Sequence, residues 1–256
     1  MTGEPVGQTG AVPREWDAAT YAQVALPHSG WAMAVLDRLD LDGHETVLDA
    51  GCGSGKVTEA LLARLPRGRV VAVDGSVQML EEARRRLTGS LDRVDLVHAD
   101  LAQPLPITTT VDAVVSSATF HWIADHRALF ANLAAVLPAG GALSAQCGGA
   151  GNVANVQAAL DELGFDGPDP WHFATPEEAT ADLAGAGFVD IRTWLTEAPT
   201  AVPADQLETF LAIVVLGAHL EHISEPDQAH FVRAVAELLP KSEIHYVRLN
   251  ILARKA

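Results

Sequence analysis

Short apolar runs alternate with helix-like segments through the middle of this chain of 256 residues, and this alternation restricts the fold strongly. The runs are rich in Val and Leu, are too short for typical helices, and do not alternate strictly with polar residues. Strands covered on both faces have this character, and helices between them lead to right-handed crossovers in an open parallel sheet. The predicted strands are residues 46–50, 69–73, 94–98, 111–116 and 142–147, and the predicted helices are 56–65, 77–87 and 125–137.

Further helical and strand patterns flank this alternating region. Residues 14–24 and 30–39 precede it as two predicted helices, and residues 152–163 and 176–186 follow it as two more. Residues 188–195 and 244–252 read as strands, with helical segments 204–220 and 227–239 between them. We therefore predict an N-terminal helical arm or lid in residues 1–40 and one main α/β domain in residues 41–256, including a helical cap at about 200–240.

The composition indicates in which compartment the protein acts and which classes of partner it binds. The formal charge is −16, from 17 Lys and Arg against 33 Asp and Glu, and such a field repels the phosphates of nucleic acids. Two cysteines make a disulfide framework improbable, no signal-peptide pattern opens the chain, and the apolar run 211–216 is too short to span a membrane. We expect a cytoplasmic protein, a monomer or a homodimer, that acts on a small molecule and binds neither nucleic acid nor membrane.

A glycine-rich segment follows the first predicted strand. Asp49 ends that strand, and Gly51, Gly53 and Gly55 follow at alternate positions before a helix, as in loops that bind nucleotide-like ligands. A phosphate-binding loop of nucleotide triphosphatases would need Gly at position 50 and Ser or Thr at position 57, which hold Ala50 and Val57. A dinucleotide fingerprint would place its third glycine at Lys56. Neither phosphate-binding pattern fits.

The remaining acid-x-Gly-x-Gly-x-Gly pattern resembles the motif of class I S-adenosylmethionine-dependent methyltransferases. The match continues through the strand ends 70–74, 98–101 and 111–116. Trp16-Asp17, Tyr21, segment 118–123 and a final Tyr-x-Arg strand resemble, more narrowly, the trans-aconitate 2-methyltransferase-like group. The resemblance implies a Rossmann-like three-layer αβα sandwich with seven mainly parallel strands in the order 3-2-1-4-5-7-6 and an antiparallel last strand.

The resemblance also implies a cofactor site at the strand ends. Asp74 would accept hydrogen bonds from the ribose hydroxyls, and Asp100 would take the adenine amino group. Met79 would pack on the adenine or in the helix–sheet core, and Cys52 would fill space beside the loop. The cofactor-binding residues predicted in this way are Tyr21, Asp49, Gly51, Cys52, Gly53, Asp74, Gly75, Met79, Asp100, Leu101 and Ser117.

The acceptor side is predicted from the segment after the fourth strand, because ligands of open α/β sheets bind at the carboxyl ends of the strands. His121 is a candidate catalytic base, with structural packing as the alternative reading, and Trp122 follows it. Arg248 would bind a substrate carboxylate or face solvent. Trp16 would close over the site or anchor a terminal helix, and Trp171 would line the pocket. No metal site is predicted, because His219 and His222 lack accompanying ligands.

These features predict an enzyme that transfers a methyl group from S-adenosylmethionine to a carboxylate or hydroxyl oxygen of a small molecule by in-line displacement. One alternative is a protein that binds S-adenosylmethionine without methyl transfer, as a non-methylating catalyst or a scaffold. A second alternative, an NAD-dependent oxidoreductase, is disfavoured by Lys56. The sequence does not specify the acceptor.

Overall fold

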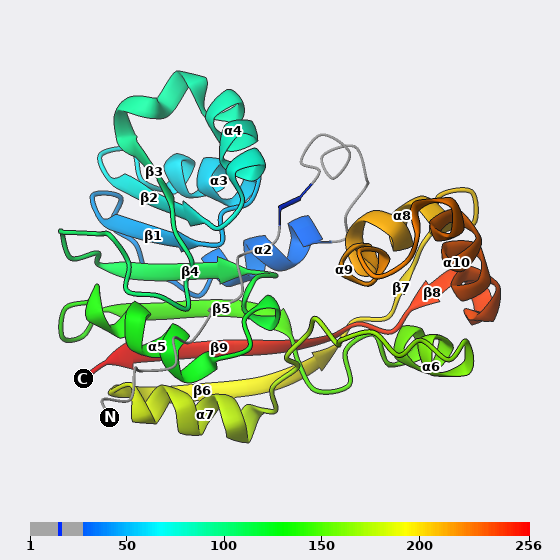
Figure 1. The fold of residues 1–256 in the computed structure, drawn as a ribbon. Coiled ribbons are helices and arrows are strands. Elements are labelled where there is room, and N and C mark those ends of the chain that lie inside the picture. The colour runs from blue at the N-terminus through cyan, green and yellow to red at the C-terminus, as the bar shows by residue number, and fades with distance from the viewer. Residues whose placement is uncertain (1–14, 17–27) are drawn as a thin grey trace, which may run out of the picture.

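A seven-stranded mixed sheet forms the centre of the protein (Figure 1), in a computed structural model that describes residues 15–16 and 28–256. The strand order is β3-β2-β1-β4-β5-β9-β6, and β9 runs antiparallel to both of its neighbours. This arrangement confirms the predicted order and the antiparallel last strand. The strands are β1 (Thr46–Ala50), β2 (Arg69–Asp74), β3 (Val94–His98), β4 (Ala113–Ser117), β5 (Ala142–Gly148), β6 (Phe188–Glu197) and β9 (Val247–Lys255).

Helices cover both faces of the sheet and complete the predicted three-layer sandwich. Neighbouring residues of β1 point to opposite faces, since Val47 packs in one buried cluster and Leu48 in the other. Both faces are apolar for this reason, and no strict alternation appears in the sequence. One face carries α2 (His28–Leu36), α3 (Lys56–Arg64) and α4 (Val77–Arg86), and the other carries α5 (His126–Ala135) and α7 (Pro176–Gly185).

Side-chain caps fix where several of these helices begin. The Ser76 hydroxyl accepts the Met79 amide at the start of α4, and Asp125 accepts the Ala128 amide at the start of α5. Thr175 and Glu178 form a reciprocal capping box at the start of α7. At the end of α2, Ser144 on β5 donates to the carbonyl oxygen of Val35, which holds this helix on the sheet.

A helical cap lies beyond the carboxyl ends of the parallel strands (Figure 1). Its apolar cluster includes Phe210, Leu211 and Tyr246. The cap consists of α6 (Ala154–Glu162), α8 (Leu207–Phe210), the π-helix η3 (Leu211–Val215), α9 (Gly217–Leu220), α10 (Glu225–Leu238) and the short strands β7 (Thr200–Ala201) and β8 (Glu243–Ile244). Short 3-10 segments are η1 (Thr88–Arg93), η2 (Phe120–Trp122) and η4 (Pro240–Ser242), the last of which lies between α10 and β8 of the cap.

Two predicted elements are divided in the structure. The single helix predicted over 204–220 is interrupted by η3, where the Leu216 amide donates to the Leu211 carbonyl five residues earlier. The strand predicted over 244–252 divides because its first residues pair with β7, while β9 enters the main sheet between β5 and β6. Within the described ranges, the helices are all too short or too polar to cross a membrane.

Candidate active site

The glycine-rich loop turns sharply at the end of β1. The amides of Gly51 and Cys52 both donate to the Val73 carbonyl of β2, at 2.8 and 2.9 Å. Gly51 has φ +81°, and a Cβ there would lie 2.2 Å from side-chain atoms of Thr119. Gly53 also has positive φ, +52°, but a Cβ there would meet nothing within 4 Å. Gly51 is therefore required by packing, whereas Gly53 borders open space.

Asp74 connects this loop to the start of α4. Its Oδ2 accepts the Gly53 amide at 2.8 Å and its Oδ1 accepts the Ser76 amide at 2.9 Å. Burial raises the pKa of Asp74, and these two amides oppose the rise. Each carboxylate oxygen has two lone pairs, so both oxygens retain capacity to accept a ligand hydroxyl. The geometry is compatible with the predicted ribose contact.

Glu15 caps the same helix from the N-terminal side. Its carboxylate accepts the Ser76 hydroxyl at 2.8 Å and the Val77 amide at 3.0 Å. An acid at a helix N-terminus is favoured by the helix dipole. Desolvation raises the pKa of Glu15, but the hydrogen bonds from Ser76, Val77 and Gln78 together outweigh it, and the pKa is lowered. Glu15 thereby places the adjacent Trp16 beside the strand ends.

Asp49 is buried at the end of β1, with 1% of its surface exposed. Thr58 donates its hydroxyl to Oδ2 at 2.7 Å, while Oδ1 is buried and has no hydrogen-bond partner among the described residues. Burial raises the pKa of Asp49 to about 7, with a smaller contribution from the charge of Asp74. A buried carboxylate oxygen beside the glycine loop suits a hydrogen bond from a polar group of a ligand. Cys52 is also buried, and burial raises the pKa of its thiol, which suits packing better than nucleophilic chemistry.

The pKa of Asp49 predicts a pH-dependent stability of the ligand-free protein. A raised pKa means that the folded state binds the proton more tightly than the unfolded chain, so the free energy of unfolding falls as pH rises from about 4 to about 7. Asp49→Asn removes this dependence, and the stability of the variant relative to wild type is expected to rise by about 2–4 kcal/mol between pH 4.5 and pH 8. Urea unfolding at the two pH values measures it. Asp190→Asn, at an exposed position, is the control, and equal shifts in both variants would contradict the assignment.

The other predicted cofactor residues lie at or near the carboxyl ends of the same strands. The Gly75 carbonyl contacts Nε2 of His98 at 2.9 Å, and Asp100 accepts the Ala102 amide through Oδ1 at 2.9 Å. Met79 and Leu101 are buried, and Ser117 is half-buried at the end of β4. Tyr21 lies outside the described residues. The structure thus brings the described members of the predicted set to one edge of the sheet.

A pocket lies next to this edge, between the sheet and the cap. It holds about 450 Å3 of empty space, part of which is open to solvent. The predicted acceptor residues Trp16, His121, Trp122, Trp171 and Arg248 all line it. The other described lining residues were not predicted from the sequence, and they are Ala118, Asn152, Val153, Val214, Val215 and Tyr246.

Polar groups of this pocket converge on Gly148, the last residue of β5. The Gly148 amide donates to Nδ1 of His121 at 3.2 Å, and Gly148 is directly opposite Arg248 in the β5–β9 register. A Cβ on Gly148 would lie 2.7 Å from Cε1 of Phe173 and 2.8 Å from Nδ2 of Asn152. The Asn152 carbonyl oxygen accepts the Val247 amide at 3.0 Å, and its amide hydrogens make no hydrogen bond to another described residue. Glycine at 148 therefore leaves room for the side chains of Phe173 and Asn152.

The sequence left two readings of Arg248, binding of a substrate carboxylate or exposure to solvent. The structure excludes the second, because Arg248 is buried. Its side chain is 2% exposed, and its guanidinium carbon lies 4.6 Å from the ring centroid of Trp31 on α2. Arginine remains charged under all ordinary conditions. A fixed positive charge is therefore held at the wall of the pocket.

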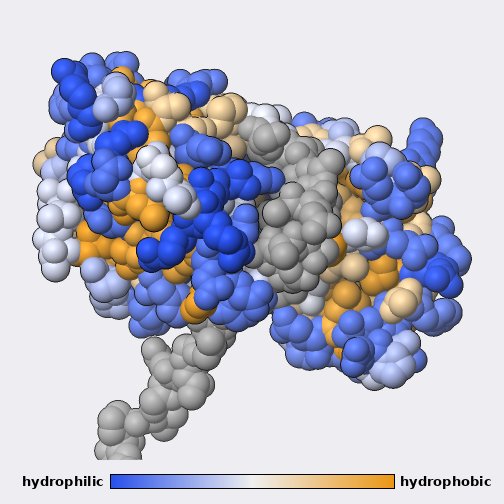
Figure 2. Space-filling model, turned by 90° about the horizontal axis from the view of Figure 1, so that it is seen from above, coloured by the Kyte–Doolittle hydropathy of each residue, from blue (hydrophilic) through white to orange (hydrophobic). Residues whose placement is uncertain are grey.

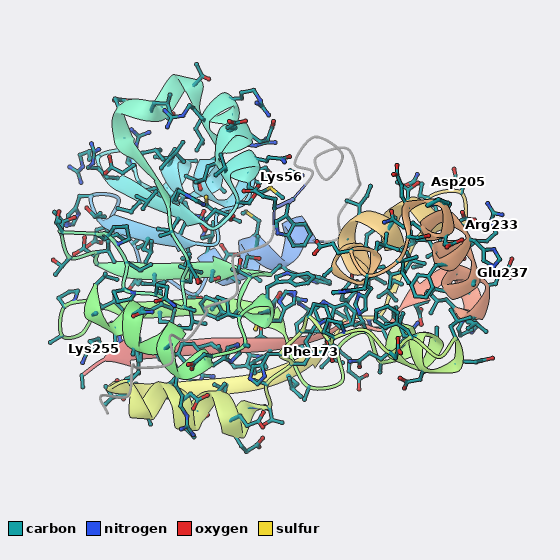
Figure 3. All side chains as sticks on the ribbon, viewed as in Figure 1. Lys56, Phe173, Asp205, Arg233, Glu237 and Lys255 are labelled. Atoms are coloured by element: carbon teal, nitrogen blue, oxygen red, sulfur yellow. The ribbon has the colours of Figure 1, made fainter. Side chains whose placement is uncertain are left out.

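Most of the other described residues of the wall are aromatic or aliphatic. Trp16 and Trp122 meet edge to face with ring centroids 5.1 Å apart, and Trp171 lies 6.4 Å from Trp122. Phe173 stacks on Trp171 at 5.3 Å and is labelled in Figure 3, close to where the sheet meets the cap. From the cap side, η3 contributes Val214 and Val215. The pocket thus joins a cationic end to a large apolar surface.

Comparisons with known proteins agree with this geometry. Residues 47–141 match the family model described as "Methyltransferase domain". A trans-aconitate 2-methyltransferase of Acidovorax sp. is 36% identical over 132 residues, which are 52% of this chain and 49% of the relative, so about half the length of that relative is matched. The Escherichia coli trans-aconitate 2-methyltransferase is 26% identical over 94% of this chain and 98% of its own.

These matches support a class I S-adenosylmethionine-dependent methyltransferase of the trans-aconitate 2-methyltransferase-like group. A solved structure of phosphoethanolamine N-methyltransferase 2 from Haemonchus contortus, with phosphomonomethylethanolamine and S-adenosylhomocysteine, has the same fold. It superposes with a TM-score of 0.61 at 18% identity, covering 88% of this chain and 52% of that one.

The cofactor of this family is S-adenosylmethionine, and the described residues fit it. Open space borders Gly53, the buried Oδ1 of Asp49 lacks a partner among the described residues, and Asp74 retains acceptor capacity. Asp49 and Asp74 were recognisable from their positions at strand ends. Asn152 and the two valines carry no local signal, because they reach the pocket only through the packing of the cap against the sheet.

Proposed function

We propose that this methyltransferase transfers the methyl group of S-adenosylmethionine to a carboxylate oxygen of a small molecule. The observation that favours a carboxylate over a hydroxyl is the buried guanidinium of Arg248, which lines the acceptor pocket. Arg binds carboxylates through paired hydrogen bonds and a full charge. The names of the relatives are consistent with such an acceptor.

The cofactor would be held along the strand ends. Asp74 would accept the ribose hydroxyls, Asp100 and Leu101 would contact the adenine, and Asp49 would face the methionine part. The loop glycines would let the backbone approach the ligand closely. The remaining predicted residues, Tyr21, Cys52, Gly75, Met79 and Ser117, complete this proposed site.

When bound, the cofactor supplies an electrophilic methyl group on a sulfonium, and the protein contributes alignment and the exclusion of water. A carboxylate is ionised at pH 7 and needs no base. Arg248 and the Asn152 amide would hold the carboxylate, with a remaining lone pair of one of its oxygens directed at the methyl group. Trp16, Trp122 and Trp171 would keep water from the reacting atoms.

His121 suits a hydrogen-bond donor better than a general base. The Gly148 amide donates to Nδ1, so the proton of the neutral ring resides on Nε2. The Nε2–H group can donate a hydrogen bond to an acceptor carboxylate. A general base would instead need a free lone pair on Nε2 to take a proton from the acceptor. We therefore assign His121 to positioning of the acceptor.

His121→Ala is expected to raise the KM for the acceptor about 10-fold to 100-fold, the value of a hydrogen bond to a charged group, and to change kcat less than about threefold. Steady-state kinetics at saturating cofactor separate the two constants. His121→Asn, which can retain an N–H donor, should recover part of the lost affinity. A collapse of kcat at unchanged KM would instead support the base role.

We further propose that residues 1–40 act as an arm or lid on a main domain of residues 41–256, because Glu15 and Trp16 contact the cofactor edge and the acceptor pocket. Free, buried Cys52 and Cys147 fit a reducing compartment, which supports a cytoplasmic location. The net charge of −16 supports a small-molecule partner and argues against nucleic acid. A monomer or a homodimer is expected.

Calorimetric titration of the full chain with S-adenosylhomocysteine and with NAD tests the cofactor. Methyl-ester formation from a mixture of carboxylic acids, followed by mass spectrometry, tests the transfer. Binding of S-adenosylhomocysteine together with ester formation supports the proposal. Binding of S-adenosylhomocysteine without transfer to any acid would favour a non-methylating protein, and binding of NAD alone would favour an oxidoreductase.

A further inference from the structure

One aromatic side chain, Phe173, contacts His121 without belonging to the lining of the acceptor pocket. It is half-buried and packs against the apolar cluster of the cap. Apolar residues are visible on the surface of both the sheet region and the cap (Figure 2), so apolar character alone indicates no particular role for Phe173. The geometry of its ring relative to His121 is more informative.

The ring of Phe173 stacks on the ring of His121. Their centroids are 6.0 Å apart, and their planes make an angle of 27°. The edge of the same phenyl ring reaches the end of β5, because its Cε1 would lie 2.7 Å from a Cβ on Gly148. Gly148 thus gives His121 a hydrogen bond through its amide and leaves room for the ring that stacks on His121.

These two contacts restrict different motions of the His121 ring. The Gly148 amide holds Nδ1 at 3.2 Å, but a single hydrogen bond still allows the ring plane to turn. The χ2 torsion of a histidine is broad, so the side chain itself opposes such a turn only weakly. The flat face of Phe173 opposes it directly. Together the two contacts orient Nε2, the atom that the proposed function directs at the acceptor.

The backbone around Phe173 is held on both sides. The His172 amide donates to the His121 carbonyl at 2.9 Å, and the Ala150 amide donates to the Ala174 carbonyl at 3.0 Å. Helix α7 begins directly afterwards with its capping box. A side chain on a segment fixed in this way can hold a neighbouring ring in one orientation.

We propose that Phe173 is a positioning residue that acts through His121, and that its flat ring keeps Nε2 of His121 directed at the acceptor carboxylate. This inference rests on the proposed function and adds to it a residue outside the pocket lining. A branched aliphatic side chain would fill much of the same space without a flat face, so the shape of the ring is decisive and its apolar burial is not.

Phe173→Leu is expected to raise the KM for the acceptor by about threefold to tenfold, the effect of losing one aromatic pair, and to change kcat less than about threefold. Steady-state kinetics of the full-length protein at saturating cofactor give both constants. The acceptor is trans-aconitate, or the acid of the mixture that is esterified fastest if trans-aconitate is not used. Phe173→Met, which also lacks a flat ring and adapts to irregular space, replaces Phe173→Leu if that variant folds poorly.

Two further variants separate the shape of the ring from general packing. Phe173→Tyr keeps the ring and should retain the wild-type KM within about twofold. Phe231→Leu is the matched control, because Phe231 packs against the same apolar cluster and pairs with Phe165 at 5.7 Å, outside the described lining. This control should have the wild-type KM. An equal rise of KM in Phe231→Leu and Phe173→Leu would overturn the inference.

A double-mutant cycle determines whether Phe173 acts through His121. In the His121→Ala background, Phe173→Leu should change the KM less than about twofold, because the ring that Phe173 orients is absent. An equal effect of Phe173→Leu in both backgrounds would overturn the inference, since a residue that only supports the fold would weaken both proteins alike.

The orientation of His121 can also be measured without an acceptor. In the full-length protein with histidines labelled at their ring nitrogens, NMR shifts distinguish a proton on Nε2 from one on Nδ1, and His121→Ala identifies the His121 signals by their loss. We expect the Nε2–H form in wild type and in Phe231→Leu, and a share of the Nδ1–H form in Phe173→Leu. Unchanged His121 signals in Phe173→Leu would overturn the inference. The expected change of these signals, with no ester formed from any acid, would refute the proposed function and leave the orientation of His121 by Phe173 supported.

Discussion

Arg248→Gln is expected to lower kcat/KM for the carboxylate acceptor by about 30-fold to 5000-fold, while the affinity for S-adenosylhomocysteine stays within about twofold. The size follows from the loss of a buried charged partner, which typically weakens binding by about 2–5 kcal/mol. Arg248 lies in the acceptor pocket and belongs to β9, away from the glycine loop. The loss should therefore be confined to the acceptor.

Two further variants make the Arg248 result interpretable. Arg248→Lys keeps the charge but not the planar pair of donors, and should recover activity only in part. Arg192→Gln removes an exposed guanidinium from neighbouring β6 and should behave as wild type. Steady-state kinetics and calorimetry measure both ligands. An unchanged kcat/KM in Arg248→Gln would remove the central support for a carboxylate acceptor.

Substitution of Gly51 and Gly53 by Ala should separate folding from cofactor binding. Gly51→Ala forces a Cβ against Thr119 at φ +81°, and should lower the free energy of unfolding by about 3 kcal/mol and the Tm by about 6–12 °C. Gly53→Ala meets no atom within 4 Å, so its Tm should fall by less than about 4 °C. Its added methyl group enters the open space beside the loop, and affinity for S-adenosylhomocysteine should fall at least tenfold.

Thermal unfolding and calorimetry measure these two effects. Gly89→Ala is the matched control, because a Cβ there also meets nothing within 4 Å and its φ does not lie in the left-handed region. This control should retain both stability and cofactor affinity. Full affinity in Gly53→Ala would mean that the cofactor does not occupy the space beside Gly53.

The cofactor half of the site could be predicted because its signals are local. Asp49, Gly51 and Asp74 each follow directly from a buried strand, and parallel strands bring their carboxyl ends to one edge whatever the rest of the chain does. The strand order required the resemblance to a family, since periodicity alone does not order strands. The predicted ends of most strands and helices differ from the structure by one or two residues.

The acceptor half could be predicted only in part because it depends on contacts distant in sequence. Trp122 and Arg248 were found as unusual residues near strand ends, but Asn152 and Val214 look like ordinary loop and helix residues. Arg248 meets Gly148 only because β9 enters antiparallel between β5 and β6. The π-helix that directs Val214 and Val215 toward the pocket depends on a hydrogen bond five residues back, which an apolar run does not reveal.

We predict that Glu15 and Trp16 couple the binding of the two ligands thermodynamically. One residue is bonded to the start of α4 beside Asp74, and the next packs on Trp122 in the acceptor pocket. A ligand that orders this short segment at either end lowers the entropy loss for the ligand at the other end. Such coupling is reciprocal, so the cofactor must raise acceptor affinity by the factor by which the acceptor raises cofactor affinity. Dissociation constants measured with and without the second ligand give this factor, and a value of one would mean that the two halves bind independently.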